Sequence, residues 1–216
     1  MAKPLSANDF RLGAEVRSSD NRTVGTLERV LVDGTDYALR ALVVREGREF
    51  SGRALSPGSA LLADEVIVPK DAIRDASRER IDLELSSADV RRLPPYLSYR
   101  YETESPSEEL ADIASVITSN PTVPRSLEEV AHKKAGELEM EAGENVMLGR
   151  TGKKLGTVKD ILFDDDQLVG IVLQKSGLLR REVILPRRFL GRSDDLALFA
   201  ELGEEDLNHL EPFQAQ

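Results

Sequence analysis

The chain carries a succession of short apolar segments whose spacing is typical of β-strands. Val, Leu and Ile are concentrated in these segments, and Gly, Asp or Pro bound them. In the first part of the chain these apolar segments are residues 26–33, 41–44, 66–68 and 81–85. Residues 81–85 alternate apolar with acidic side chains, as expected of a strand with one buried face. Together these segments predict a small β unit.

A short helix is expected to close this unit. Ser86 is a favourable N-cap for a helix over Ser87–Leu93, because its side chain can accept a hydrogen bond from a free backbone N–H of the first turn. Pro94 and Pro95 would then end the helix, since proline lacks an N–H and clashes with the preceding turn.

The same pattern occurs a second time later in the chain. The matched pairs are Val24–Asp33 with Leu155–Asp164, Glu65–Pro69 with Glu182–Pro186, and Asp89–Tyr96 with Asp206–Phe213. The first pair is offset by 131 residues and the other two by 117, which places extra residues in the first copy around Arg45–Asp64. Three matches in the same order indicate an internal duplication.

Each copy predicts a small antiparallel barrel, because many short strands fall within roughly 75–95 residues. Gly25 and Gly156 lie early in equivalent strands, where glycine permits bending or a close backbone approach. We therefore expect a mainly β protein. Two tandem small antiparallel β-barrels, each closed by a short helix, would occupy residues 1–97 and 142–216, joined by an acidic helical connector over 98–141.

These motifs resemble the PRC-barrel family. The resemblance rests on a Gly-x-hydrophobic strand ending in Asp, a following apolar strand, a Val-Ile-Val/Leu-Pro segment and the closing segments Asp89–Tyr96 and Asp206–Phe213. The family includes the cytoplasmic domain of the photosynthetic reaction centre H subunit and the C-terminal domain of the ribosome maturation factor RimM. The resemblance implies a protein-interaction or regulatory module, and it carries no catalytic motif.

The connector predicts two short amphipathic helices. Ser105–Glu108 and Ser126–Glu129 both have the form of a capping box, in which Ser and Glu satisfy each other's backbone donors. An apolar stripe follows the first box, at Leu110, Ile113, Ala114 and Ile117. A barrel of the same chain is the expected partner of this stripe, and a second subunit or another protein is the alternative. Tyr99 and Tyr101 are expected to pack between the barrels, and a role in a binding hot spot is the alternative.

Charge is unevenly distributed over the 216 residues. The net charge is −10, and residues 97–141 hold ten acidic against four basic side chains. Acidity of this kind opposes general nucleic-acid binding. Residues 146–192 instead hold ten basic and five acidic side chains. They contain a candidate interaction patch made of Lys153, Lys154, Arg180, Arg181, Arg187, Arg188 and Arg192. The alternative is that the acidic connector or residues 193–216 neutralise these cations.

Catalytic chemistry is scarce in this sequence. There is no cysteine, and neither His132 nor His209 has a neighbouring motif partner for acid–base or nucleophilic work. Asp164–Asp166 matches the turn Asp33–Asp36 of the first copy, so an acidic hairpin turn is favoured over a metal site. We expect no enzyme activity, no cofactor and no metal.

No run of residues is long and apolar enough for a membrane span, so a cytoplasmic protein is expected. The predicted function is a non-catalytic module that binds a protein partner. Two alternatives follow from the family resemblance: a ribosome- or RNA-processing-associated factor, and a component of a photosynthetic or membrane complex. The connector stripe also offers a route to a homo-oligomer.

Overall fold

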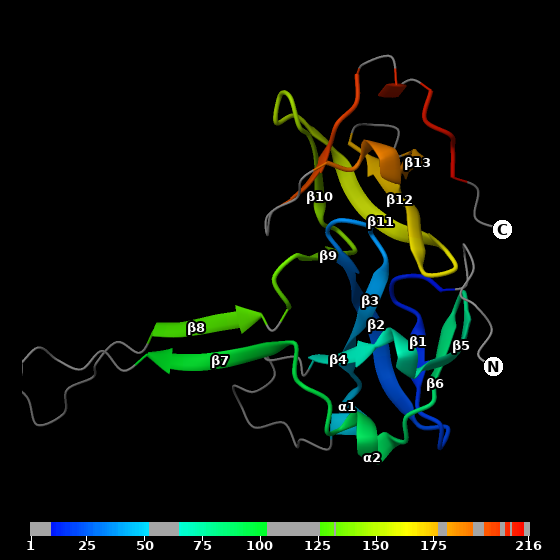
Figure 1. The fold of residues 1–216 in the computed structure, drawn as a ribbon, viewed down its shortest axis with the longest axis vertical. Helices are drawn as coiled ribbons and strands as arrows, with labels where there is room; N and C mark the ends of the chain where they lie inside the picture. The colour runs from blue at the N-terminus through cyan, green and yellow to red at the C-terminus, as the bar shows by residue number, and fades with distance from the viewer. Residues whose placement is uncertain are drawn as a thin grey trace, which may run out of the picture.

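The computed structural model describes residues 10–51, 65–102, 126–131, 133–176, 181–191, 197–203, 206–207 and 209–213. The protein is mainly β, as the sequence predicts. Figure 1 shows two sheets, one above the other, with a separate two-stranded ribbon beside them.

The first sheet is built from the N-terminal half and has the strand order β4-β3-β2-β1-β6-β5. Its strands are β1 (Glu15–Arg17), β2 (Thr23–Asp33), β3 (Leu39–Glu46), β4 (Glu65–Pro69), β5 (Ile73–Ser77) and β6 (Arg80–Leu83). Three short helical turns lie between or after them, α1 (Arg48–Ser51), η2 (Lys70–Ala72) and α2 (Ser87–Val90). A seventh strand, β9 (Glu137–Glu141), pairs with β2.

The second sheet has the order β13-β12-β11-β10-β14. Its strands are β10 (Asn145–Leu148), β11 (Lys154–Asp164), β12 (Gln167–Lys175), β13 (Glu182–Pro186) and β14 (Leu198–Ala200). The turn η3 (Arg187–Phe189) follows β13, just as η2 follows β4.

The two sequence repeats form sheets whose strands pair in the same register. Val16 pairs with Gly25 in the first sheet, and Val146 pairs with Gly156 in the second. Both pairings shift register at the next residue, and the β2–β3 and β11–β12 ladders also share their two irregularities. The connection from β3 to β4 is longer than that from β12 to β13, where the sequence offset changes.

The expected closed barrels are not found. Within the described residues, the terminal strands β4 and β5 do not pair with each other, and neither do β13 and β14. Within the described residues, each closing segment adds a single isolated bridge to its sheet and not a strand, Val66–Pro95 in the first half and Val183–Pro212 in the second. Proline has no N–H to extend a ladder, which explains why these contacts remain single bridges. The expected closing helices are not shown either: α2 is one turn, shorter than the predicted Ser87–Leu93.

The helical connector is also corrected. The second predicted helix, beginning at Ser126, is instead strand β8 (Ser126–Ala131), which pairs along six residues with β7 (Leu97–Glu102). A helix of this length is marginal without tertiary contacts, whereas strand pairing gives every residue a ladder partner. The end of the connector is strand β9. The Leu110–Ile117 stripe lies outside the described residues, and so does any helix there.

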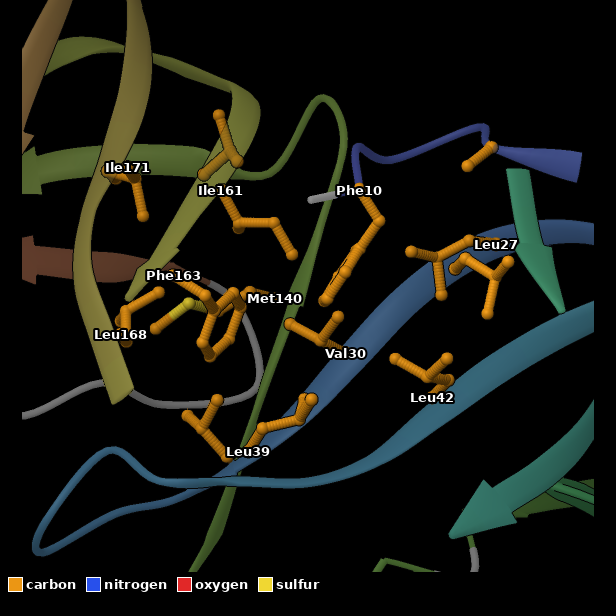
Figure 2. Close-up of a cluster of buried hydrophobic side chains, with 14 of the residues drawn as sticks. Phe10, Leu27, Val30, Leu39, Leu42, Met140, Ile161, Phe163, Leu168 and Ile171 are labelled. Carbon is orange, nitrogen blue, oxygen red and sulfur yellow. The ribbon is translucent and has the colours of Figure 1, made fainter. Parts of the chain in front are cut away.

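One hydrophobic core spans both sheets. Its buried members include Val30 and Leu42 of the first sheet and Ile161 and Leu168 of the second. Figure 2 shows Phe10, Met140 and Phe163 meeting between the sheets. The rings of Phe10 and Phe163 stack with centroids 5.7 Å apart. The two halves therefore bury apolar surface against each other rather than around two separate centres.

The contacts between the halves follow a pseudo-two-fold pattern. The Leu39 N–H donates to the Asp166 carbonyl at 2.8 Å, and the equivalent Leu168 N–H donates to the Tyr37 carbonyl at 3.1 Å. Ala38 and Gln167, also equivalent, form the bridge between these bonds. Such an exchange of equivalent residues defines an isologous interface in symmetric dimers. Here it occurs within one chain.

Candidate functional site

Three of the predicted patch residues lie at one end of the second sheet. Lys153 and Lys154 are exposed where β11 begins, and exposed Arg181 directly precedes β13. The Arg181 carbonyl accepts a hydrogen bond from the Lys175 N–H at 3.0 Å, and Lys175 pairs with Gly156. The ladder thus brings Lys154 and Arg181 to the same end of the sheet. Lys153, Lys154 and Arg181 are called the basic end below.

Arg187 and Arg188 are separated from the basic end by strand β13. At about 3.3 Å per residue, roughly 20 Å of extended chain lies between Arg181 and Arg187. The Arg187 guanidinium lies 4.9 Å from the centre of the Tyr37 ring, in the interface between the halves. Arg188 lies 4.8 Å from the Phe189 ring. The patch therefore falls into two parts, and Arg180 and Arg192 lie outside the described residues.

The interface gives Arg187 a structural role. Its contact with Tyr37 is the pseudo-symmetric counterpart of the ion pair between Lys70 and Asp166, whose Nζ and Oδ2 atoms are 2.6 Å apart. Asp166 belongs to the hairpin turn between β11 and β12, in which Asp165 has a φ of 52°. Asp164–Asp166 thus forms the predicted acidic turn, and one of its carboxylates binds a lysine of the other half.

A largely buried ion network joins strands β2, β4 and β9 of the first sheet. The Arg29 guanidinium lies 3.2 Å from a Glu65 carboxylate oxygen, 3.3 Å from Glu141 and 4.8 Å from the centre of the Tyr96 ring. The Tyr96 hydroxyl donates to Glu139. Glu65 and Tyr96 are almost fully buried, at 5% and 1% exposure. Burial raises the pKa of Glu65, while Arg29 opposes that rise.

The equivalent place in the second half is an open hollow of about 660 Å³. The internal alignment puts Asp160 at the position of Arg29, Glu182 at Glu65 and Phe213 at Tyr96. All three line the hollow, but none fills it as Arg29 and Tyr96 fill the first. The remaining lining residues come from both halves and are Arg11, Leu12, Gly13, Arg78, Ala142, Gly143, Thr157, Val158, Lys159 and Gln174.

Asp160 holds the two halves together at this hollow. Its Oδ1 atom accepts hydrogen bonds from the Leu12 N–H at 3.0 Å and from the Ile161 N–H at 2.9 Å. Burial raises the pKa of this carboxyl, and hydrogen bonds from both backbone groups oppose the rise, as do the charges of Arg78 and Arg11. Asp160 is thus committed to an internal contact that its counterpart Arg29 does not make.

A smaller groove of about 290 Å³ contains His209. Its other described lining residues are Ile184, Pro186, Arg188, Phe189, Asp206, Leu210 and Glu211. His209 is exposed there, as the sequence alignment with Arg92 predicts, and Asp206 supplies a carboxylate on the same groove. His132 lies outside the described residues.

The residues of the hollow were not singled out from the sequence. Arg11, Arg78 and Lys159 are isolated cations there, with no motif around them. The signal that could have found them is the internal alignment, in which a buried arginine of one copy is replaced by an aspartate in the other. Aspartate is shorter than arginine, so the replacement of Arg29 by Asp160 leaves open the space that a guanidinium would fill.

Comparison with known families locates one domain. Residues 143–198 match the model of the PRC-barrel domain, a span that begins just before β10 and ends at the first residue of β14. A PRC-barrel domain is therefore present in the second half. The match does not extend to the copy predicted over residues 1–97. No curated protein matches the chain. In the described parts of the chain, no helix combines the length and apolarity that crossing a membrane requires.

Proposed function

We propose that the protein is a non-catalytic interaction module that binds an acidic surface of a protein partner through the basic end. The presence of a PRC-barrel domain supports a module of this kind at the family level. The basic end belongs to that domain, because Lys153, Lys154 and Arg181 all fall within residues 143–198.

One contrast between the halves carries the proposal. Most exposed arginines described in the first half have a carboxylate partner within the chain, for example Arg40 with Asp33 at 2.9 Å and Arg80 with Asp82 at 3.1 Å. Among the described residues, no carboxylate oxygen lies within 4.0 Å of Lys153, Lys154 or Arg181. These three cations therefore have charge available for an external partner.

The surrounding charge makes this surface selective. The chain as a whole carries −10, so a partner with dispersed negative charge is repelled over most of the surface. A compact acidic patch can be steered to the basic end, where the local sign is opposite. Binding of this type weakens as salt screens the charges, over a Debye length of about 8 Å at physiological ionic strength.

Affinity capture from lysate with a charge-reversed variant tests the proposal. The variant Lys153→Glu/Lys154→Glu/Arg181→Glu removes the basic end. A matched control, Arg22→Glu/Arg74→Glu/Arg92→Glu, makes the same change in net charge at exposed positions of the first half. We expect one stoichiometric partner to be retained by the natural chain and the control, and at least about tenfold less by the basic-end variant.

Two results would overturn the proposal. Equal capture by the basic-end variant would show that these cations do not bind the partner. Retention of ribosomal subunits, or flotation with phosphatidylserine vesicles, in place of a single protein would redirect the function to RNA or to an anionic membrane. Both alternatives are measured on the same three proteins at low and at physiological salt.

A further inference from the structure

The hollow between the halves has a filled counterpart in the same molecule. In the first half the corresponding space is closed by Arg29, whose guanidinium contacts two carboxylates and an aromatic ring. In the second half Asp160 is shorter and turns its Oδ1 atom to backbone donors. The second half therefore has the same strands around this space, but it has Asp160 in place of the arginine that closes the space in the first half.

The walls of the hollow keep an aromatic ring. Phe213 takes the place of Tyr96, but it is half-buried where Tyr96 is only 1% exposed. Its ring contacts the Arg78 guanidinium, which lies 5.9 Å from the ring centre. An aromatic ring that is half-buried and lines an open hollow is suited to contact with the apolar part of a ligand.

The rim of the hollow is open on the side of two glycines. Gly13 and Gly143 occupy equivalent turns with φ of +84° and +88°. Each donates its N–H to the strand of its own sheet, at 2.7 Å to Leu27 and 2.8 Å to Val158. Apart from each glycine and its two chain neighbours, no heavy atom of the described residues lies within 4 Å of the position that a Cβ would take there. The turns are thus held in place while leaving space above them.

Basic groups exceed acidic groups around this space. Arg11, Arg78 and Lys159 face Asp160 and Glu182. Arg11 has a carboxylate neighbour in Glu79 at 3.6 Å, but the side chains are 46% and 80% exposed, so solvent weakens this pair. Asp160 accepts hydrogen bonds from two backbone donors through one oxygen, and the charges of Arg78 and Arg11 also act on it.

The charges around the hollow are opposite in sign to those around Arg29 in the first half. Glu141 and Glu28, which lie at the filled site of the first half, correspond by the internal alignment to Arg11 and Lys159 at the hollow. The first site thus surrounds a cation with acids, and the second presents cations to a space that can take an anion. Gln174, in place of Arg45, adds an uncharged amide donor.

We propose that this hollow is a binding site for a small organic anion. Its carboxylate or phosphate group is held by Arg11, Arg78 and Lys159, and its apolar part lies against Phe213. Guanidinium and ammonium donors suit both anionic groups. None of the three basic-end residues lines this hollow, although the two adjoin each other, because Glu182 directly follows Arg181 and pairs with Gln174.

Titration of the full chain with phenyl phosphate, followed by ¹H–¹⁵N NMR, tests this inference. We expect saturable shifts of the amide signals of Thr157, Lys159 and Gln174, all of which line the hollow. Benzoate and inorganic phosphate separate the contributions of a carboxylate, a phosphate and the ring. Benzyl alcohol and benzylamine, which are neutral and cationic, are expected not to bind there.

Variants with reversed charge at the hollow provide a second test of the anion site. Arg78→Glu/Lys159→Glu should weaken phenyl phosphate binding at least about tenfold, as loss of charge-assisted bonds does. Lys159→Gln is a milder variant that tests the same point if the double variant does not fold. Arg74→Glu/Arg92→Glu is the matched control, at exposed positions outside the hollow.

Failure of this inference is distinguishable from failure of the partner-binding proposal. The variant Lys153→Glu/Lys154→Glu/Arg181→Glu changes no lining residue and should weaken phenyl phosphate binding less than Arg78→Glu/Lys159→Glu does. The absence of saturable shifts, equal binding of benzylamine, or unchanged binding by both hollow variants would each overturn the anion site.

Discussion

Glu144 sits beside other carboxylates at the turn between β9 and β10. Its carboxylate accepts a hydrogen bond from the Glu141 N–H at 3.3 Å. Burial raises its pKa to about 8, the Glu139 and Glu141 charges add to the rise, and the Glu141 N–H and Lys133 oppose it. The folded protein thus retains a proton at neutral pH that the unfolded chain releases.

This retained proton makes stability depend on pH. The folded pKa is raised above the ordinary value of 4.5, so unfolding releases a proton between pH 4.5 and about 8. The free energy of unfolding should therefore fall as pH rises through that window. Glu144→Gln removes the ionisable group and should raise the free energy of unfolding at pH 8 by on the order of 2 kcal/mol, with little effect at pH 4.5.

Urea unfolding at the two pH values measures this effect. Glu49→Gln, at an exposed position of α1, is the matched control and should leave the pH dependence unchanged. A Glu144→Gln protein that lost stability equally at both pH values would contradict the assignment of the retained proton to Glu144.

At the scale of single residues, sequence patterns identified side chains with local roles. The Ser86 side chain accepts a hydrogen bond from the Asp89 N–H at 3.3 Å, as its position before a helix predicts. Tyr96 is buried, as its alignment with Phe213 suggested. The Arg29 network escaped prediction, because its members come from β2, β4, the closing segment and β9. Only the folded chain brings such distant residues together.

Gly25 and Gly156 lie at equivalent positions of the two sheets, where the backbone of the paired strand comes very close. A Cβ at Gly25 would lie 1.8 Å from the Arg45 carbonyl oxygen, and one at Gly156 would lie 2.1 Å from that of Gln174. Both obstacles are backbone atoms of the paired strand, so no side-chain movement can relieve the clash. The sequence had indicated a close backbone approach at these two glycines.

Alanine at either glycine should therefore be strongly destabilising. Gly25→Ala and Gly156→Ala should each lower the free energy of unfolding by about 2–4 kcal/mol, measured by urea unfolding, because the strand pair must separate. Gly203→Ala is the control, since the nearest atom to its Cβ would be an Asp206 carboxylate oxygen at 3.5 Å. Equal effects at all three positions would show that the close approach is not the cause.

Strands with a partner in their own repeat were predictable, and strands with a distant partner were not. Residues 26–33 and 66–68 alternate or cluster apolar side chains, and both lie in strands. Ser126–Ala131 has the composition of a capped helix, yet it pairs with β7. Glu137–Glu141 alternates acidic and apolar residues, but only β2 of the first sheet makes it a strand. Pairing across the chain overrides local preference in such segments.

The whole molecule combines two repeats in one core. The segment before β10 is strand β9, which crosses to the first sheet, and the equivalent segment before β1 places Phe10 on Phe163 of the second. Each repeat thus sends the residues that precede it to the other repeat. The sequence revealed the duplication but predicted two barrels with separate cores, because a repeat pattern contains no information on which half covers which apolar face.

Native-state hydrogen exchange on a core variant tests whether the halves unfold together. Phe163 is 3% exposed and belongs to the second sheet, and Phe163→Ala should cost about 3–4 kcal/mol by removing a buried ring. If the shared core makes the molecule one cooperative unit, the amides of Val30 and Leu42 in the first sheet should lose as much protection as those of Ile161 and Ile171 in the second. Val90→Ala, in α2 of the first half, gives the reciprocal measurement. Loss of protection confined to the mutated half in both variants would instead establish two independently folding domains, with a division between residues 97 and 142.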